Sequence, residues 1–361
     1  MIGPHSQTQK DLAGNYFTDI GVGTCSGPTC ITTVEKAMST VNGAAVTTVL
    51  GCPDRKCASI SPANMSAALA AAKGADVVVM AMGLDGSIEG EGHDRLNITL
   101  PGMQKQLIKS IIAAAAGKPI VLLLFNGGTI AIEEIQNEDI AIVECFYPGA
   151  SGGQSVAESL FGVSNRWGKM PFTYVHNNYT ELSNFVNMNM TNDPAIKGQI
   201  GRTYKYIKDQ SLVAWPFGFG LSLTTFEIAA PSAAYRVTAT EPAAVSVKVS
   251  NTGKVAGDEV VFLFHNASAA QTAWDPLDPQ ALKQLLGFQR VTLAAGASTT
   301  VHFNVTADKL SVVDKEGTRH SLAGQHELIL SRGHGKELHR RLALDLGGAK
   351  RKVISTLTPE E

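Results

Sequence analysis

Six ionisable residues stand close together in one polar stretch of this 361-residue chain. They are Asp85, Glu89, Glu91, His93, Asp94 and Arg95. Four carboxylates within ten positions would repel one another if they were simply solvated, so the nearby His93 and Arg95 indicate a paired constellation. Like charges in close contact push pKa values apart, which is how a site obtains both a proton donor and a proton acceptor.

An apolar run immediately before this stretch must position it. Val77 to Met80 lie between Gly74 and Gly83, a pattern typical of a fully buried strand in a parallel sheet. Ligands of open α/β sheets bind beyond the carboxyl ends of the strands, so we expect the polar loop at a binding edge. A solvated surface crossover is the alternative interpretation of the loop.

The first half of the chain alternates between strand and helix patterns. Strands are predicted at 46–50, 77–82, 120–125 and 140–146, and helices at 66–72 and 103–116. This alternation predicts a parallel sheet with flanking helices. A flavodoxin-like nucleotide-binding protein is an alternative that rests on topology alone, because the turn Phe125-Asn126-Gly127-Gly128 lacks the spacing of a dinucleotide motif.

Beyond Pro231 the hydrophobic period changes to two, and short strands alternate with turns. This pattern predicts an all-β sandwich. We therefore expect an α/β domain at 1–168, an irregular linker at 169–230, a β-sandwich at 231–348 and a tail at 349–361. Trp274 falls in a long loop between two strands, where it more readily pins the loop than contacts a substrate.

Several segments together resemble glycoside hydrolase family 3, especially its β-xylosidase-like branch. They are Gly83-Leu84-Asp85, Ile88 to Arg95, Leu100 to Gln104, Tyr147 to Gly153, Trp215 to Phe226 and Lys283 to Phe288. The resemblance implies an α/β sandwich domain followed by a fibronectin type III-like domain. The barrel that carries the nucleophile in that family has no counterpart in this sequence.

The resemblance also implies roles for the polar loop. Glu89 is expected to be the general acid/base, and Glu91 is the second choice. Asp85, Asp94 and Arg95 are expected to support them, with Arg95 holding Asp94 ionised, and His93 and Tyr147 are candidates to line the cleft. No metal and no cofactor are expected, and the expected partners are an oligosaccharide and the missing barrel.

The function implied is part of a retaining, exo-acting β-xylosidase or β-glucosidase that acts on plant-type polysaccharide fragments. The chain would supply the acid/base but not the nucleophile. A non-catalytic carbohydrate-binding or scaffold module is the alternative. A net charge of −2 excludes no fold, but it argues against nucleic-acid and membrane-surface partners. No apolar stretch reaches the ~18 residues that a membrane span requires.

Cysteines and glycosylation motifs indicate an oxidising compartment. Two local pairs, Cys25 with Cys30 and Cys52 with Cys57, predict disulfides, and Cys145 is then a free thiol; a four-cysteine zinc site is the alternative. Six Asn-x-Ser/Thr motifs begin at Asn64, Asn97, Asn178, Asn189, Asn266 and Asn304. We therefore expect a secreted protein, although the residues after Met1 do not form a signal peptide.

Overall fold

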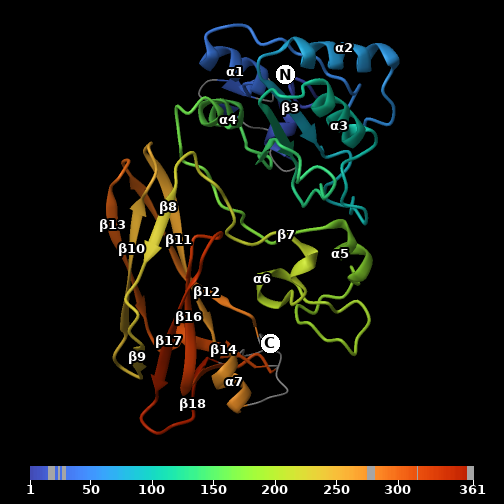
Figure 1. The fold of residues 1–361 in the computed structure, drawn as a ribbon. Helices are drawn as coiled ribbons and strands as arrows, with labels where there is room; N and C mark the ends of the chain where they lie inside the picture. The colour runs from blue at the N-terminus through green and yellow to red at the C-terminus, as the bar shows by residue number, and fades with distance from the viewer. Residues whose placement is uncertain (15–20, 23–24, 27–29, 275–280, 315, 356–361) are drawn as a thin grey trace. The chain divides into compact units, whose positions relative to one another are not determined.

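The computed structural model describes residues 1–14, 21–22, 25–26, 30–274, 281–314 and 316–355. The chain divides into two compact units (Figure 1). Unit 1 comprises Met1–Ser164 with Val175–Glu181, and unit 2 comprises Asn165–Tyr174 with Leu182–Glu361. Among the described residues, no helix is both long enough and apolar enough to cross a membrane.

A three-stranded parallel sheet forms the centre of unit 1 (Figure 1). Its strands are β3 (Val78–Gly83), β4 (Ile120–Phe125) and β5 (Ala141–Glu144), in that order. Every residue of β3 is buried, as its uninterrupted apolar run predicts. The parallel register brings the carboxyl ends of β3 and β4 together, with Gly83 opposite Phe125.

The strand predicted at 46–50 is wrong in extent, because only Val49 makes a bridge, to Ile2. The chain turns away directly afterwards, where Gly51 has a φ of 69° and the Cys52 amide donates to the Leu50 carbonyl. A two-stranded ribbon of β1 (Gly21–Val22) and β2 (Cys25–Ser26) lies earlier in the chain.

Four helices flank the sheet: α1 (Val34–Asn42), α2 (Pro62–Gly74), α3 (Gln104–Ala114) and α4 (Gly152–Leu160). Local chemistry sets two of their starts, since the Thr33 and Ser61 hydroxyls accept from the third amide after each, at Lys36 and Asn64. Helices α1 and α4 contribute to the same buried core as β3 and β4. The predicted parallel sheet with flanking helices is confirmed.

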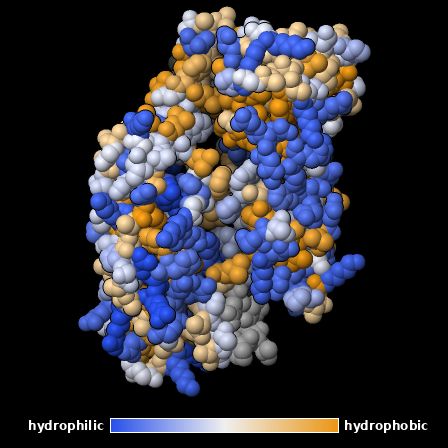
Figure 2. Space-filling view, viewed as in Figure 1, coloured by the Kyte–Doolittle hydropathy of each residue, from blue (hydrophilic) through white to orange (hydrophobic). Residues whose placement is uncertain are grey.

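Short elements occur where the sequence predicted an irregular linker. Two of them contain residues of unit 1, namely β6 (Tyr174–Val175) and α5 (Asn177–Leu182). The others lie in unit 2 and are α6 (Thr203–Tyr206), β7 (Val213–Trp215) and β8 (Phe226–Ala229). Large apolar side chains are exposed between 182 and 196, at Leu182, Phe185, Val186, Met188, Met190 and Ile196. Figure 2 shows such hydrophobic residues interspersed among hydrophilic ones on the visible face.

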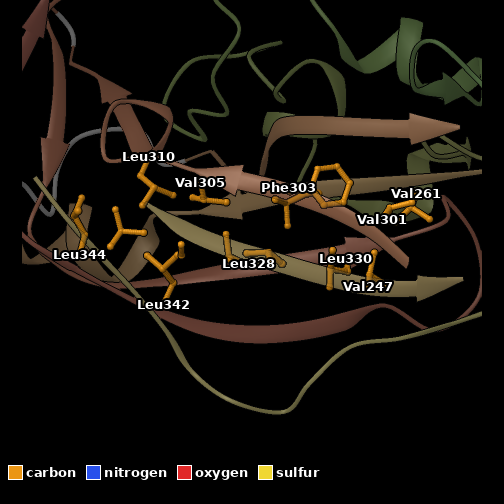
Figure 3. Packing of buried hydrophobic residues seen from close by; sticks show 14 of the residues in the cluster. Val247, Val261, Val301, Phe303, Val305, Leu310, Leu328, Leu330, Leu342 and Leu344 are labelled. Atoms are coloured by element: carbon orange, nitrogen blue, oxygen red, sulfur yellow. The ribbon is translucent and has the colours of Figure 1, made fainter. Parts of the chain in front are cut away.

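Two sheets make the predicted β-sandwich. The larger has the order β12-β11-β16-β17-β9 and the smaller β13-β10-β8. Their bounds are β9 (Tyr235–Thr238), β10 (Ala243–Asn251), β11 (Gly257–Asn266), β12 (Gln284–Leu293), β13 (Ser298–Val305), β16 (Gly324–Ser331) and β17 (Leu338–Asp345). Val247, Val261, Phe303, Leu328 and Leu342 interdigitate in the core between them (Figure 3). The period-two pattern thus identified this part of the fold correctly.

Part of the predicted tail, 349–361, forms strand β18 (Arg351–Ser355), and residues 356–361 lie outside the described residues. Strand β18 pairs with β15 (Arg319–Leu322), which also pairs with β14 (Ser311–Val313). Backbone pairing with β15 therefore orders residues 351–355, which the sequence placed in a tail. The expected loop around Trp274 contains a helix, α7 (Ser268–Trp274), and the Trp274 ring lies against His320.

Candidate functional site

The polar loop starts from a constrained backbone at the end of β3. Gly83 has a φ of 139°, and a Cβ there would come within 1.9 Å of the Phe125 carbonyl oxygen, so only glycine fits. The Leu84 amide donates to the same carbonyl at 2.7 Å. The Asp85 carboxylate then accepts from the amide and hydroxyl of Ser87, at 3.0 and 2.6 Å, which turns the chain.

Glu89 is the most completely bonded carboxylate of the loop. Its Oε2 accepts from Arg95 Nε at 2.8 Å and lies 2.6 Å from Arg95 Nη2, while its Oε1 accepts from the Gly128 amide at 2.6 Å. Arg95 also donates to the Thr129 carbonyl at 2.8 Å. The side chains of Glu89 and Arg95 are 21% and 9% exposed, so this is a partly buried, charge-assisted link between two loops.

Glu91 occupies a different environment two residues later. Gly90 and His93 exchange backbone hydrogen bonds of 3.3 and 2.9 Å, and Gly92 has a φ of 75°, so residues 90–93 form a tight turn. Glu91 lies in this turn and is exposed, and its side chain makes no hydrogen bond or ion pair among the described residues. The exposed His93 ring lies with Nδ1 3.3 Å from the Glu91 carbonyl oxygen.

The expected pairing of Arg95 with Asp94 does not form. The turn at 90–93 reverses the chain, which brings Arg95 back against Glu89. Asp94 is exposed. Arg95 is therefore a partner of the first glutamate, while Asp94 does not join the constellation.

Tyr147 lies beside Glu89 at the carboxyl end of β5. A Cβ built on Gly127 would come 2.9 Å from Glu89 Oε1 and 3.1 Å from Tyr147 Cε2, so the two side chains share one small space. Burial, followed by the charges of Glu89 and other carboxylates, raises the pKa of Tyr147 to about 12. Its hydroxyl thus stays protonated and can donate a hydrogen bond at any physiological pH.

The sequence alone missed several residues around Glu89. The sequence predicted no role for the turn 126–128 beyond the absence of a dinucleotide motif, but its Gly128 amide donates to Glu89 and the Asn126 amide group donates to the Gly128 carbonyl at 2.7 Å. Arg95 Nη1, Asn126 Oδ1 and the Tyr147 hydroxyl are buried without a hydrogen-bond partner in the described protein. The rule that strand carboxyl ends share one edge could have found Asn126, because it directly follows β4.

A second polar cluster lies at the same end of the sheet. His5 is fully buried, stacks on Phe125 and places Nδ1 3.6 Å from the Asp11 carboxylate, which also binds Arg55 at 2.5 Å. Burial lowers the pKa of His5 to about 4, against the opposing effect of Asp11. His5 is therefore neutral near pH 7, while Asp11 and Arg55 form the ion pair.

Cysteine pairing removes the zinc alternative. Cys52 and Cys57 form a disulfide, as predicted, and Cys30 is also disulfide-bonded. The side chain of its predicted partner, Cys25, lies outside the described residues. Cys145 has a free thiol. No group of three or more His, Cys, Asp and Glu side chains in the described ranges could hold a metal ion.

The six glycosylation motifs differ in their surroundings. Five of their asparagines are exposed: Asn64, Asn97, Asn178, Asn189 and Asn304. Asn266 is half-buried in β11, where its side-chain amide donates to the Leu282 carbonyl at 3.0 Å and its Oδ1 accepts from the Ser268 amide at 2.8 Å.

Comparisons with known proteins identify both parts of the chain. Residues 1–223 match the glycosyl hydrolase family 3 C-terminal domain, and residues 259–333 match the fibronectin type III-like domain. Similar curated proteins include β-xylosidase/α-L-arabinofuranosidase 2 of Medicago sativa subsp. varia, at 31% identity over 91% of this chain and 43% of that protein. β-D-xylosidase 1 of Arabidopsis thaliana is 32% identical over 91% of this chain and 44% of its own length.

A solved structure is similar to nearly the whole chain. It is a family 3 exo-β-xylosidase in complex with a xylobiose aziridine activity-based probe, with a TM-score of 0.83 and 27% identity. The alignment covers 99% of this chain and 46% of that one. The present chain thus spans less than half the length of the proteins that it matches, whose family 3 C-terminal domain normally accompanies an N-terminal barrel.

Proposed function

The chain belongs to glycoside hydrolase family 3, and we propose that it is the acid/base-bearing part of a retaining, exo-acting β-glycosidase of the β-xylosidase or β-glucosidase type. It would act on short plant-type polysaccharide fragments. Retention requires two carboxyl groups ~5 to 5.5 Å apart, one that attacks the sugar and one that protonates the leaving oxygen. The nucleophile would come from the barrel, which is the proposed partner.

The observation that carries this proposal is the loop at the carboxyl end of β3, which presents two glutamates in different bonding states. A general acid must hold a proton on one carboxylate oxygen and then release it to the substrate. Both oxygens of Glu89 already face N–H donors of Arg95 and Gly128, so a proton on either would oppose an existing hydrogen bond.

The carboxylate oxygens of Glu91 do not face N–H donors in this way among the described residues. Glu91 lies in the exposed turn at 90–93, and its carboxylate makes no hydrogen bond or ion pair in the described part of the chain. The sequence favoured Glu89 for proton transfer, whereas these contacts favour Glu91, with Glu89 anchoring the loop through Arg95. We propose that assignment for the enzyme in which the barrel is present.

The test compares Glu89→Gln and Glu91→Gln in an enzyme that contains this chain and its barrel. Loss of the proton donor should lower kcat/KM for xylobiose by about 10²–10⁴-fold but spare kcat/KM for dinitrophenyl β-xyloside, whose leaving group departs without protonation. Turnover of the activated substrate should still slow, because the glycosyl-enzyme then lacks the base that activates water. Azide should partly restore turnover of the activated substrate in the same variant, because a small anion replaces water that lacks a base. We expect Glu91→Gln to behave in this way.

Glu89→Gln should instead reduce cleavage of both substrates by a similar factor and respond little to azide. If Glu89→Gln shows the leaving-group contrast and the rescue, the roles are reversed and Glu89 is the acid/base. If both variants keep full activity on xylobiose, the loop is structural and the proposed function is wrong. Asp94→Asn is the matched control, because Asp94 is exposed and outside the constellation.

A carbohydrate-binding or scaffold module without catalysis is the other function that we propose to test. Such a module would bind xylo-oligosaccharides by itself but would not restore activity to a barrel. We also propose that the protein is secreted, supported by the disulfide Cys52–Cys57 and by five exposed glycosylation motifs.

A further inference from the structure

Gln104 lies between the base of the polar loop and the loop closed by the Cys52–Cys57 disulfide. It is the first residue of α3 and is fully buried. Its Oε1 accepts from the Gly83 amide at 2.9 Å, and its Nε2 donates to the Gly83 carbonyl at 2.8 Å. One side-chain amide therefore satisfies both backbone groups of the residue from which the loop starts.

The same amide reaches the disulfide loop. Gln104 Nε2 donates to the Arg55 carbonyl at 2.6 Å, and Arg55 lies within the six residues that the disulfide closes. The Met103 amide donates to the Cys57 carbonyl at 2.8 Å. A Cβ on Gly102 would come within 2.3 Å of the carbonyl oxygens of Lys56 and Cys57, so the helix start packs tightly on this loop.

Opposite Gln104, the loop base has no freedom to shift. Gly83 lies against the Phe125 carbonyl so closely that a Cβ would overlap it, and β4 is a central, buried strand. Gly83 therefore lies between the sheet on one side and Gln104 on the other, and loss of the Gln104 hydrogen bonds would leave only the sheet to support it. From Gly83 the chain needs only six more residues to reach Glu89.

We propose that Gln104 is a positioning residue that couples the Cys52–Cys57 disulfide loop to the loop carrying Glu89 and Glu91. The catalytic meaning of this coupling rests on the function proposed above, but the coupling itself concerns this chain alone. Its consequence is that the base of the polar loop is held more firmly while the disulfide is closed than when it is open. Reduction would thus loosen the candidate site without requiring the unit to unfold.

Amide hydrogen exchange tests the coupling directly, because it measures local opening residue by residue. The readouts are the amides of Glu89, bonded to the Asp85 carbonyl, and of His93, bonded to the Gly90 carbonyl. Gln104→Met removes all three hydrogen bonds with little change of volume, and Cys52→Ala/Cys57→Ala opens the disulfide loop. Each should speed exchange at both amides by about tenfold.

The decisive measurement is made on the triple variant, which combines Gln104→Met with Cys52→Ala/Cys57→Ala. If Gln104 transmits the effect, the triple variant should exchange no faster at Glu89 and His93 than the faster of the two parents. Gln104→Glu refines the result, because its carboxylate can still accept from the Gly83 amide but cannot donate to Arg55; it too should uncouple the loop from the disulfide. Gln136→Met is the matched control and should leave both amides unchanged, since Gln136 does not contact this loop.

Two outcomes overturn the proposal. In the first, the disulfide and Gln104 variants speed exchange independently, so that their effects multiply in the triple variant. In the second, the loop amides accelerate only as much as amides of β4, which marks global destabilisation. If the cysteine variant does not fold, dithiothreitol is added to a Cys30→Ala protein with and without Gln104→Met, so that Cys52–Cys57 is the disulfide under test. None of these results depends on whether either glutamate is catalytic.

Discussion

Arg95 binds Glu89 through two guanidinium nitrogens, Nε at 2.8 Å and Nη2 at 2.6 Å from the same carboxylate oxygen. The two residues are six positions apart, and the turn at 90–93 brings them together. Because Arg95 also donates to Thr129 and Glu89 accepts from Gly128, this pair joins the loop after β3 to the loop after β4. The exposed turn containing Glu91 is held at its base by this pair.

Breaking the pair should destabilise unit 1. Removing one partner of a largely buried ion pair costs ~3 kcal/mol, because the other charge is left unpaired. We therefore expect Arg95→Ala to lower the urea midpoint clearly, and Arg95→Lys to lower it less, because an ammonium keeps the charge but not the planar fork. Arg236→Ala is the control: its pair with Asp345 is exposed and its loss should leave the midpoint unchanged.

A methyl group at Gly127 should displace Glu89. The new Cβ would lie 2.9 Å from Glu89 Oε1 and 3.1 Å from the Tyr147 ring, which is closer than van der Waals contact allows. We expect Gly127→Ala to speed amide exchange at Gly128, whose N–H then loses its acceptor. Gly74→Ala is the matched substitution, because a Cβ there meets nothing within 4 Å. Equal exchange at Gly128 in both variants would contradict the packing described here.

Acid should destabilise unit 2 through a buried histidine pair. His265 Nε2 and His326 Nδ1 lie 2.8 Å apart, and burial lowers the pKa of His265 to about 3. In the unfolded state the histidine has a pKa of ~6.5, so it binds a proton at pH values where the folded histidine is still neutral. Its contribution to the free energy of unfolding is therefore fully present above pH ~6.5 and is lost as the pH falls toward 3. Each such proton contributes a slope of up to about 1.4 kcal/mol per pH unit.

Chemical denaturation between pH 7 and 4 measures this slope. His265→Gln should make the curve shallower, because the substituted residue binds no proton in either state. His302→Gln should preserve the wild-type slope, since His302 is exposed and its ring already bonds to Ser246. A wild-type slope that His265→Gln does not change would mean that other groups govern the acid response.

The glycosylation motifs should not be used equally in a eukaryotic secretory host. Asn266 is half-buried and its amide nitrogen donates to the Leu282 carbonyl, so a glycan there would break a strand-end contact. We expect peptide mass spectrometry to find Asn266 unmodified and glycans among the exposed motifs, such as Asn64 and Asn304. Modification of Asn266 with the exposed motifs empty would contradict this ordering.

Hydrophobic periodicity and short local motifs were sufficient to predict much of the fold. Strand β4 lies at Ile120–Phe125, where the sequence placed it, because an uninterrupted apolar run is stable only as a strand covered on both faces. The alternation in 245–249 likewise predicted a half-buried strand of the sandwich, and Val245, Val247 and Val249 are buried. Cys52 and Cys57 are close enough in sequence for their disulfide to be predicted locally.

The sequence by itself also predicted that the polar loop directly follows a buried parallel strand, and the loop does follow β3. In open α/β sheets the carboxyl ends of strands form the edge at which ligands bind. Only the tertiary structure decided how the charges of this loop are shared. Arg95 pairs with Glu89 and not with its neighbour Asp94, and Glu89 also accepts a hydrogen bond from the Gly128 amide, which follows β4. Gln104 connects Gly83 to Arg55, which lies 49 positions away from Gln104 in the sequence. These pairings depend on which groups folding brings within about 3 Å of one another. The partners of such hydrogen bonds do not recur at regular spacing in the sequence, so periodicity cannot predict them.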